Sequence, residues 1–322
     1  MTSPRRFAAI GLGVLTILLC VLAGMIAFGT ESPPPPLASI GAPFRSVDYS
    51  DLPRPAKYPA RDGAQLTFRT YPADPARIAV MVHGSSSNGP SLHSMAKAAQ
   101  AAGFTVQALD VRGHGESGTK GDISYNGQLD DDLADFVAYL RKQSPGATLV
   151  LVGFSSGGGF ALRTAGGVNG DLFDRYVLVS PALPHDAPTI RPNTGGWVTP
   201  FIPRIIGLTI LDRLGIHAFE HLAVVAFAVN PASSSNPTPS YSYRLQQNFA
   251  AHADFRADIR NIRKPTRVMV GSNDELFIAD EFAPLFRSER ASIPVKILPG
   301  LGHTEMSVRP EALASIATAL TD

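Results

Sequence analysis

An apolar run that ends in a Gly-x-Ser-x-Gly pentapeptide constrains the fold of this chain more than any other feature. Residues 149–152 are continuously apolar, which is typical of a strand covered on both faces of a parallel sheet. The segment Gly153-Phe-Ser-Ser-Gly157 follows and leads into a stretch compatible with a helix. A sharp strand-to-helix turn needs small residues two positions before and after its central residue, so Ser155 is the candidate nucleophile and Ser156, flanked by Phe154, is not. A glycine-rich turn with a purely structural role has the same local pattern, so other parts of the sequence must show whether Ser155 is catalytic.

Strand-like and helix-like segments alternate along most of the 322-residue chain. Apolar or alternating runs predict strands at 65–71, 78–82, 104–109, 147–153, 176–180, 266–271 and 295–298. Apolar residues at helical spacing predict helices at 91–102, 129–140, 279–286 and 311–320. This alternation predicts an α/β fold with a mostly parallel central sheet, right-handed crossovers and helices on both faces.

The alternation breaks between Pro184 and His252. This block is rich in proline and has no strand-like run, and its most apolar part, 197–229, is interrupted by Arg and acidic residues. Charges at this spacing disfavour a membrane span and favour amphipathic helices. We therefore expect 184–252 to be a helical cap insertion that divides the core into a first part, 46–183, and a second part, 253–322.

The N-terminal apolar run, Phe7 to Phe28, is 22 residues long and carries no charge. As a helix it would measure about 33 Å, enough to cross a bilayer core. Arg5 and Arg6 precede it, which predicts a cytoplasmic N-terminus and a body on the periplasmic or extracytoplasmic side. A single transmembrane helix within residues 1–29 is thus the first prediction. A signal peptide cut near Gly29, giving a secreted protein, and a buried helix are the alternatives.

Residues 30–45 form a proline-rich linker, with four consecutive prolines at 33–36. Polyproline favours an extended, semi-rigid conformation. We expect this linker to hold the body away from the membrane surface.

Charge and cysteine content exclude some classes of function. The formal net charge is +1, which gives no electrostatic reason to expect a nucleic-acid partner. The single cysteine, Cys20, lies in the N-terminal apolar run. The body therefore has no disulfide, no thiol nucleophile and no cysteine-based metal site.

Chemically capable side chains follow four of the predicted strands. Ser155 follows the strand at 147–153, Asp274 the strand at 266–271 and His303 the last strand, while His83-Gly-Ser85 follows the strand at 78–82. Loops that leave the carboxyl ends of parallel strands gather at one edge of the sheet. A hydroxyl, an imidazole to take its proton and a carboxylate to orient the imidazole are the parts that nucleophilic acyl chemistry needs.

On these residues the chain, over about 60–322, resembles the α/β-hydrolase-fold serine hydrolases. It has their order Ser, Asp, His, their nucleophile turn, the oxyanion-strand motif His83-Gly-Ser85 and the loop motif Asp110-Val-Arg-Gly-His-Gly-Glu-Ser117. Within the family it is most similar to the monoacylglycerol lipase and lysophospholipase branch, with Phe154 and Ser156 where that branch usually has His and Met.

The resemblance assigns roles to individual residues. It implies Ser155 as nucleophile, His303 as general base and Asp274 as the acid that orients the base, with Glu275 as the alternative acid. It implies the backbone N–H groups of Ser85 and Ser156 as oxyanion donors. The supporting residues are His83, Gly84, Gly153 and Gly157. This mechanism needs no metal and no cofactor.

The implied activity is cleavage of carboxylic esters through an acyl-enzyme, and an apolar cap on a membrane-anchored body favours lipid-like esters. The alternatives are a small-ester carboxylesterase, an amidase or an acyltransferase that uses the same residues. A non-enzymatic alternative is a catalytically silent, membrane-tethered binding module.

Other polar residues favour structural roles. We expect His114 and Asp110 to stabilise the glycine-rich loop that contains them, and the acidic run at 130–132 to be a solvated helix start that suits the helix dipole. His217 and His221 are four residues apart, which would place them on one face of a helix. Without an acidic or third histidine partner in register, they are weak candidates for a metal site.

Overall fold

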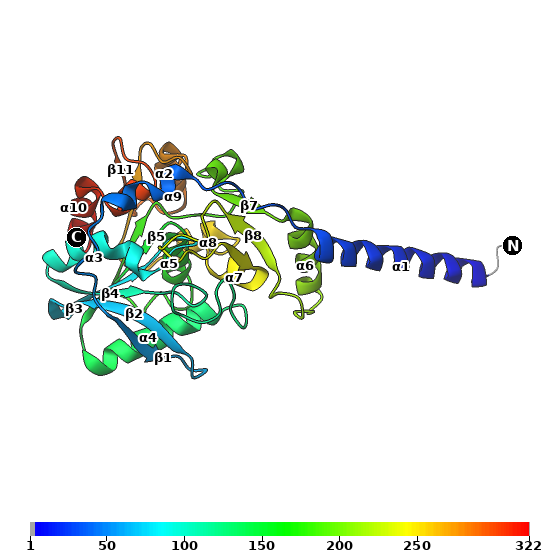
Figure 1. Ribbon diagram of the computed structural model, residues 1–322, viewed down its shortest axis with the longest axis horizontal. Helices are drawn as coiled ribbons and strands as arrows, with labels where there is room; N and C mark the ends of the chain where they lie inside the picture. Colours follow the sequence, from blue (N-terminus) through cyan, green and yellow to red (C-terminus); the bar gives the residue numbers. More distant parts are fainter. Residues whose placement is uncertain (1–3, 322) are drawn as a thin grey trace.

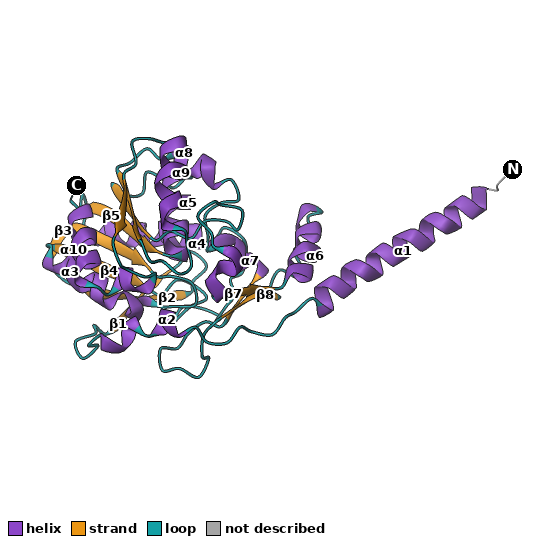
Figure 2. Ribbon diagram, turned by 90° about the horizontal axis from the view of Figure 1, so that it is seen from above, coloured by secondary structure: helices purple, strands orange, loops and turns teal. Residues whose placement is uncertain are grey.

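The computed structural model describes residues 4–321, and the side chains from residue 9 to residue 321. Arg5 and Arg6, on which the predicted membrane orientation rests, have side chains outside that range. An eight-stranded sheet lies at the centre of the body, between helices (Figures 1 and 2). A long helix, α1 (Pro4–Phe28), projects away from the body (Figure 1).

The central sheet has the strand order β1-β2-β4-β3-β5-β6-β10-β11. β1 and β2 pair with each other in antiparallel fashion, β2 is also antiparallel to β4, and all the remaining neighbours are parallel. The predicted α/β fold with a mostly parallel sheet is therefore confirmed. The strands are β1 (Pro55–Pro59), β2 (Gln65–Tyr71), β3 (Asp74–Val82), β4 (Phe104–Leu109), β5 (Thr148–Phe154), β6 (Arg175–Val179), β10 (Thr266–Gly271) and β11 (Val295–Leu298).

Helices cover both faces of this sheet. α3 and α10 pack together on one face, and α4, α5, α8 and α9 lie on the other (Figure 2). Successive residues of the central strands alternate between two apolar clusters: Ile78 and Val80 face one, and Ala79 and Met81 face the other. The helices are α3 (His93–Ala101), α4 (Gln128–Gln143), α5 (Ser156–Gly166), α8 (Phe255–Asn261), α9 (Phe282–Glu289) and α10 (Pro310–Ala319).

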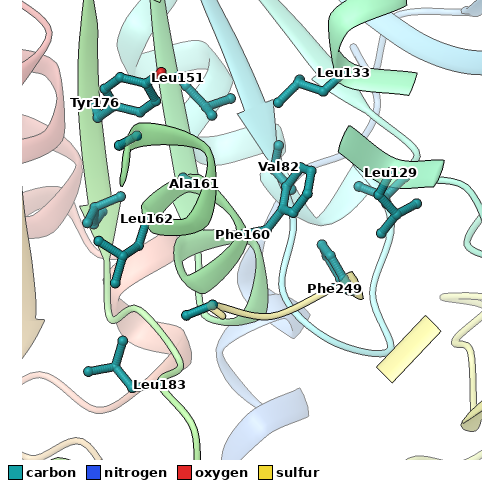
Figure 3. Close-up of a cluster of buried hydrophobic side chains, with 14 of the residues drawn as sticks. Val82, Leu129, Leu133, Leu151, Phe160, Ala161, Leu162, Tyr176, Leu183 and Phe249 are labelled. Carbon is teal, nitrogen blue, oxygen red and sulfur yellow. The ribbon is translucent and has the colours of Figure 1, made fainter. Parts of the chain in front are cut away.

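The larger cluster lies between the sheet and α4 and α5. Phe160 and Leu162 of α5 pack there with Leu133 of α4 and Val82 of β3 (Figure 3). Phe249, from the block after residue 184, is buried in the same cluster. This cluster therefore fixes α5, and with it the turn at Ser155, against the sheet.

The prediction of no strands between residues 184 and 252 is wrong. β7 (Val198–Pro200), β8 (Ala223–Phe227) and β9 (Ser240–Ser242) form a separate antiparallel sheet, beside α6 (Ile202–Arg213) and α7 (Tyr243–Asn248). β8 lies inside the apolar stretch expected to be helical. Its apolar residues give no periodicity that separates a strand from a buried helix, and β7 and β9 are only three residues long.

The acidic run at 130–132 is a solvated helix start only in part, because Asp130 and Asp131 are half-buried in the first turn of α4 and Asp132 is buried. Asp132 is buried and forms an ion pair with Arg112, 2.7 Å apart, and Asp130 pairs with Arg163 at 2.8 Å. Burial raises the pKa of Asp132, although Arg112 acts in the opposite direction. These two carboxylates hold α4 against neighbouring segments, because arginines distant in sequence reach them.

α1 is long and apolar enough to cross a membrane. Its segment Ala9–Phe28 has a mean hydropathy of 2.6, and its large side chains from residues 10 to 21 are exposed. A helix with these properties, near an N-terminus, is either a membrane span or a signal sequence. At its carboxyl end, Arg204 of α6 donates hydrogen bonds to the carbonyls of Ile26 and Ala27, at 2.7 and 3.1 Å.

Candidate active site

Ser155 occupies a strained turn between β5 and α5. Its φ and ψ are 55° and −119°, a left-handed region that few side chains adopt. A Cβ added to Gly153 would lie 2.1 Å from the carbonyl oxygen of Gly157, and one added to Gly157 would lie 2.4 Å from that of His83. Only glycine fits at either flank, as the sequence pattern predicts.

Ser155, His303 and Asp274 form one hydrogen-bonded chain. His303 Nε2 lies 2.9 Å from Ser155 Oγ, and His303 Nδ1 lies 2.8 Å from Asp274 Oδ2. The three residues are at most 5% exposed. They come from separate loops, after β5, β11 and β10, so the sheet topology brings together residues that are up to 148 positions apart.

Asp274 is held by both of its carboxylate oxygens. While Oδ2 faces the imidazole, Oδ1 accepts hydrogen bonds from the backbone N–H groups of Leu276 and Phe277, both at 2.9 Å. Its neighbour Glu275 instead accepts a hydrogen bond from the backbone N–H of His303, at 2.8 Å. Asp274, and not Glu275, is therefore the carboxylate that contacts the imidazole ring.

Two aromatic rings enclose the imidazole of His303. The ring of Phe154 lies 5.1 Å from it, and the ring of Phe277 lies 4.9 Å away, edge to face. Both rings limit rotation of the imidazole and keep water from it. These ring contacts were not predicted from the sequence, in which the position of Phe154, directly before the candidate nucleophile, was the available signal.

The loop after β3 runs alongside the nucleophile turn. A Cβ added to Gly84 would lie 3.1 Å from Ser155 Cβ, so the backbone of this loop approaches Ser155 closely. His83 is fully buried, and its Nε2 accepts a hydrogen bond from the N–H of Val111. Its Nδ1 therefore carries the proton and donates to the carbonyl of Gly84, 2.8 Å away. Burial lowers the pKa of His83, which favours this neutral form.

Ser85 lies in the loop after β3, and Ser156 is the first residue of α5, directly after Ser155. Ser85 Oγ accepts a hydrogen bond from Trp197 Nε1 at 2.9 Å, a contact that the sequence did not predict. Across residues 4–321, no backbone acceptor outside regular secondary structure pairs with the N–H of Ser85 or of Ser156. Neither N–H group is engaged by such an acceptor, and their role as oxyanion donors stays a prediction.

Comparison with known proteins identifies the family of this chain. A model of the family Hydrolase_4, described as serine aminopeptidase, S33, matches residues 73–307. The chain belongs to this α/β-hydrolase family. Its distant relatives are monoacylglycerol lipases and esterases, and its fold is the one expected from that resemblance.

Individual relatives are distant in sequence. A monoacylglycerol lipase of Mycolicibacterium smegmatis is 27% identical over 248 residues, which cover 74% of this chain and 84% of that protein. Human monoglyceride lipase is 29% identical over 153 residues, 46% of this chain and 49% of that protein. The solved structure of a soluble variant of Saccharomyces cerevisiae monoglyceride lipase superposes with a TM-score of 0.63 at 16% identity, covering 83% of this chain and 92% of that one. The last match shows the fold alone.

The glycine-rich loop of this S33-family hydrolase is organised by Asp110 and His114. Asp110 accepts hydrogen bonds from the N–H groups of Gly89 and Glu116, at 2.6 and 3.0 Å. His114 is buried, and its Nε2 lies 2.6 Å from the hydroxyl of Tyr241. Both residues stabilise the loop, in agreement with the sequence analysis.

His217 does have acidic neighbours, which the sequence analysis did not expect. Its Nδ1 lies 2.8 Å from Glu220 and 3.3 Å from Asp212, and the bond to Glu220 raises the pKa of His217. His221 does not belong to this cluster, because residues 217–221 form turns in place of the helix that would align the two histidines. The three side chains form an ion-paired turn at the end of α6.

A cavity of about 1010 Å³ opens onto Ser155 and His303. Its walls come from the loop after β3, from the segment around 228–237 and from an N-terminal segment, Pro36–Leu52. Trp197 and Leu276 also line it. The hydroxyl of Ser155 therefore faces a space large enough for a substrate of substantial size.

Proposed function

We propose that this S33-family hydrolase cleaves carboxylic esters through an acyl-enzyme formed on Ser155. The hydrogen-bonded chain from Ser155 Oγ through His303 to Asp274 carries this proposal, because it joins nucleophile, base and orienting carboxylate in one line. The positive φ of Ser155 adds support, since it exposes the hydroxyl at the top of the turn.

In the proposed first step, His303 Nε2 takes the proton of Ser155 as the hydroxyl oxygen attacks the ester carbonyl. The N–H groups of Ser85 and Ser156 stabilise the resulting oxyanion, each contributing about 3–4 kcal/mol to the transition state. The C–O bond to the alcohol then breaks, and the alcohol leaves with the proton from His303. Water, activated by His303, attacks the acyl carbonyl and releases the acid, while Asp274 stabilises the imidazolium.

We propose lipid-like esters as the substrates. The Mycolicibacterium smegmatis and human relatives are named for lipases that act on monoacylglycerols or monoglycerides. The cavity offers apolar side chains, Leu37, Ile40 and Phe44 among them, beside Ser155. We take residues 184–252 as a cap over this cavity, because Trp197 and residues 228–237 line it.

The two carboxylates that line the cavity are already engaged by other groups, which favours an ester substrate over a peptide with a free amine. A binding site for an α-amino group usually presents an unpaired carboxylate. In the described part of the chain, the acidic residues that line the cavity are Asp110 and Glu116. Asp110 is engaged by two backbone N–H groups, and Glu116 lies 3.8 Å from Arg69. Ester cleavage is therefore the first proposal, and amide cleavage or acyl transfer on the same residues is the alternative.

We further propose that α1 anchors the enzyme in a membrane, with the body on the periplasmic or extracytoplasmic side. The exposed apolar face of α6, formed by Ile202, Ile206 and Ile210, supports this proposal. It lies next to the carboxyl end of α1, so the membrane would cover both surfaces together.

A fluorophosphonate probe tests the chemistry. We expect the wild-type protein to be labelled at Ser155, and Ser155→Ala to lose both the label and at least about 10³-fold in ester hydrolysis. Ser288→Ala is the matched control, because Ser288 bonds only to its own helix α9 and does not line the cavity. An unlabelled wild-type protein would reject the enzyme in favour of a silent binding module. A p-nitrophenyl ester series then reports the acyl length, and a preference for acetyl esters alone would reject the lipid-like substrate.

A further inference from the structure

The segment Pro36–Leu52, which we call the N-terminal strap, lies against the body and not away from it. It contains the short helix α2 (Ala38–Gly41) and a 3-10 turn, Pro43–Ser46. Figure 1 shows this blue chain leaving α1 and crossing the body past α2 towards α3 and α10. The linker is thus an extended spacer at most up to residue 35, because the strap that follows packs on the body.

Hydrogen bonds hold the strap at both ends. Near its start, the N–H of Leu37 donates to the carbonyl of Ala228 at 2.9 Å, beside β8. Two residues later, Thr304 Oγ1 donates to the carbonyl of Ser39 at 3.3 Å. Near the far end, Asp51 lies 3.0 Å from Nε2 of His93 in α3. The strap therefore bridges the block after residue 184 and the core, and passes next to the residue that follows His303.

The strap contributes apolar side chains to the wall of the cavity. Leu37, Ile40 and Phe44 line it, and all three are half-buried. Leu37 and Ile40 also pack on the apolar core. The wall formed by residues 86–91 and 233–236 consists largely of serine and asparagine. Different segments thus supply apolar side chains and hydroxyl or amide groups to the cavity, which suits an ester with an apolar group on one side of the carbonyl and a hydroxylated group on the other.

We propose that the N-terminal strap is a specificity element: it binds the apolar group of the ester that Ser155 attacks. This inference rests on the proposed function of Ser155. Only residues 29–35 separate the end of α1 from the strap, so the chain that forms the anchor continues directly into the wall of the substrate cavity. Substrate selection then depends on a segment outside residues 73–307, the part of the chain that the family model matches.

Substitutions in the full-length protein, in detergent micelles, test the strap. We expect Ile40→Ala and Phe44→Ala to reduce kcat/KM for long-chain p-nitrophenyl esters by about tenfold each, with acetyl ester hydrolysis within about twofold of wild type, since each removes apolar contact with a chain only. Ile297→Ala is the matched control, because Ile297 of β11 is also half-buried against the core but does not line the cavity. Equal effects on long and acetyl esters, or none, would overturn the proposal.

A second measurement separates the strap from the chemistry. Two fluorophosphonates, one with a short and one with a long alkyl chain, compare the reaction of each variant with long-chain and short-chain reagents without turnover. Labelling by the short probe also shows that each variant is folded. If neither probe labels the wild type at Ser155, the proposed function fails by itself. Binding of a long-chain alkyl glyceryl ether, measured by calorimetry, then tests the strap alone. Binding weakened about tenfold by Ile40→Ala but not by Ile297→Ala supports the strap, and equal binding by all three proteins rejects it.

Discussion

The carboxylate of Glu275 holds the backbone of His303, with 2.8 Å between its oxygen and the N–H, and leaves the imidazole to another residue. The adjacent Asp274 bonds to the ring of the same histidine. Two neighbouring acids thus hold one histidine: Glu275 holds its main chain, and Asp274 holds its side chain. Their different contacts give different expectations for the two isosteric amides.

We expect Asp274→Asn to lower kcat by about 10³ to 10⁴-fold, because an amide in this position favours the wrong imidazole tautomer. Glu275→Gln keeps an oxygen acceptor for the N–H of His303 and should lower kcat less than tenfold. Steady-state kinetics on one ester compares the two variants, and circular dichroism checks their folding. Losses of equal size would contradict the separation of roles.

Gly157 should tolerate no side chain. A Cβ there would lie 2.4 Å from the carbonyl oxygens of both Val82 and His83, which are backbone atoms and have little freedom to move. We expect Gly157→Ala to destabilise the fold by about 1–3 kcal/mol and to displace Ser155. Urea denaturation measures the first effect and fluorophosphonate labelling the second. Gly63→Ala is a control of another kind, because a Cβ at Gly63 meets no atom within 4 Å but its φ of 84° is strained, so a stability loss with full labelling is expected there.

The bond from Trp197 to Ser85 should position the proposed oxyanion loop. Trp197→Phe removes the donor and Ser85→Ala removes the acceptor, while the N–H of Ser85 stays in place in both. Each should lower kcat about threefold to tenfold, and the double variant should lose no more than the worse single variant, because both remove one bond of about 1 kcal/mol. Additive losses in this double-mutant cycle would show that the two side chains act independently.

Stability should decline at acidic pH partly through His114. Burial holds the pKa of His114 well below its ordinary value, and the neighbouring His83 acts in the same direction. A group with a depressed pKa in the folded state contributes stability above the unfolded pKa, about 6.5, and loses it as pH falls towards the folded value. We expect His114→Gln to reduce the loss of unfolding free energy between about pH 6.5 and 4.5. His185→Gln, at an exposed position, should lose unfolding free energy with falling pH as steeply as the wild type does. If the wild type and both variants lose it equally, His114 does not have this role.

Most of the sheet could be predicted because its central strands are buried on both faces. The continuous apolar runs that end at Val82 and Phe154 follow directly from that burial. β1 was missed since it is an edge strand that begins and ends in proline, Pro55 and Pro59, and edge strands tolerate proline and exposure. Its position next to β2 depends on pairing, which the sequence of β1 alone does not encode.

The three hydrogen-bonded residues of the site could be predicted from the sequence, but the side chains around them could not. Ser155, Asp274 and His303 each follow a readable strand, so topology alone places them at one edge. The ring of Phe277 on His303 and the indole of Trp197 on Ser85 depend on how loops fold back, for which spacing gives no signal. The same holds for Asp132, whose burial depends on Arg112 arriving from another loop.

Arg204 of α6 donates hydrogen bonds to the last carbonyls of α1. This contact opposes rotation of the body relative to α1. A domain joined to its membrane anchor by a flexible linker samples every orientation relative to the bilayer. Here the close approach of Gly207 to Ile26 and the hydrogen bonds of Arg204 join α1 to α6. With α1 in a membrane, this contact would keep α6 and its exposed isoleucines at the lipid surface.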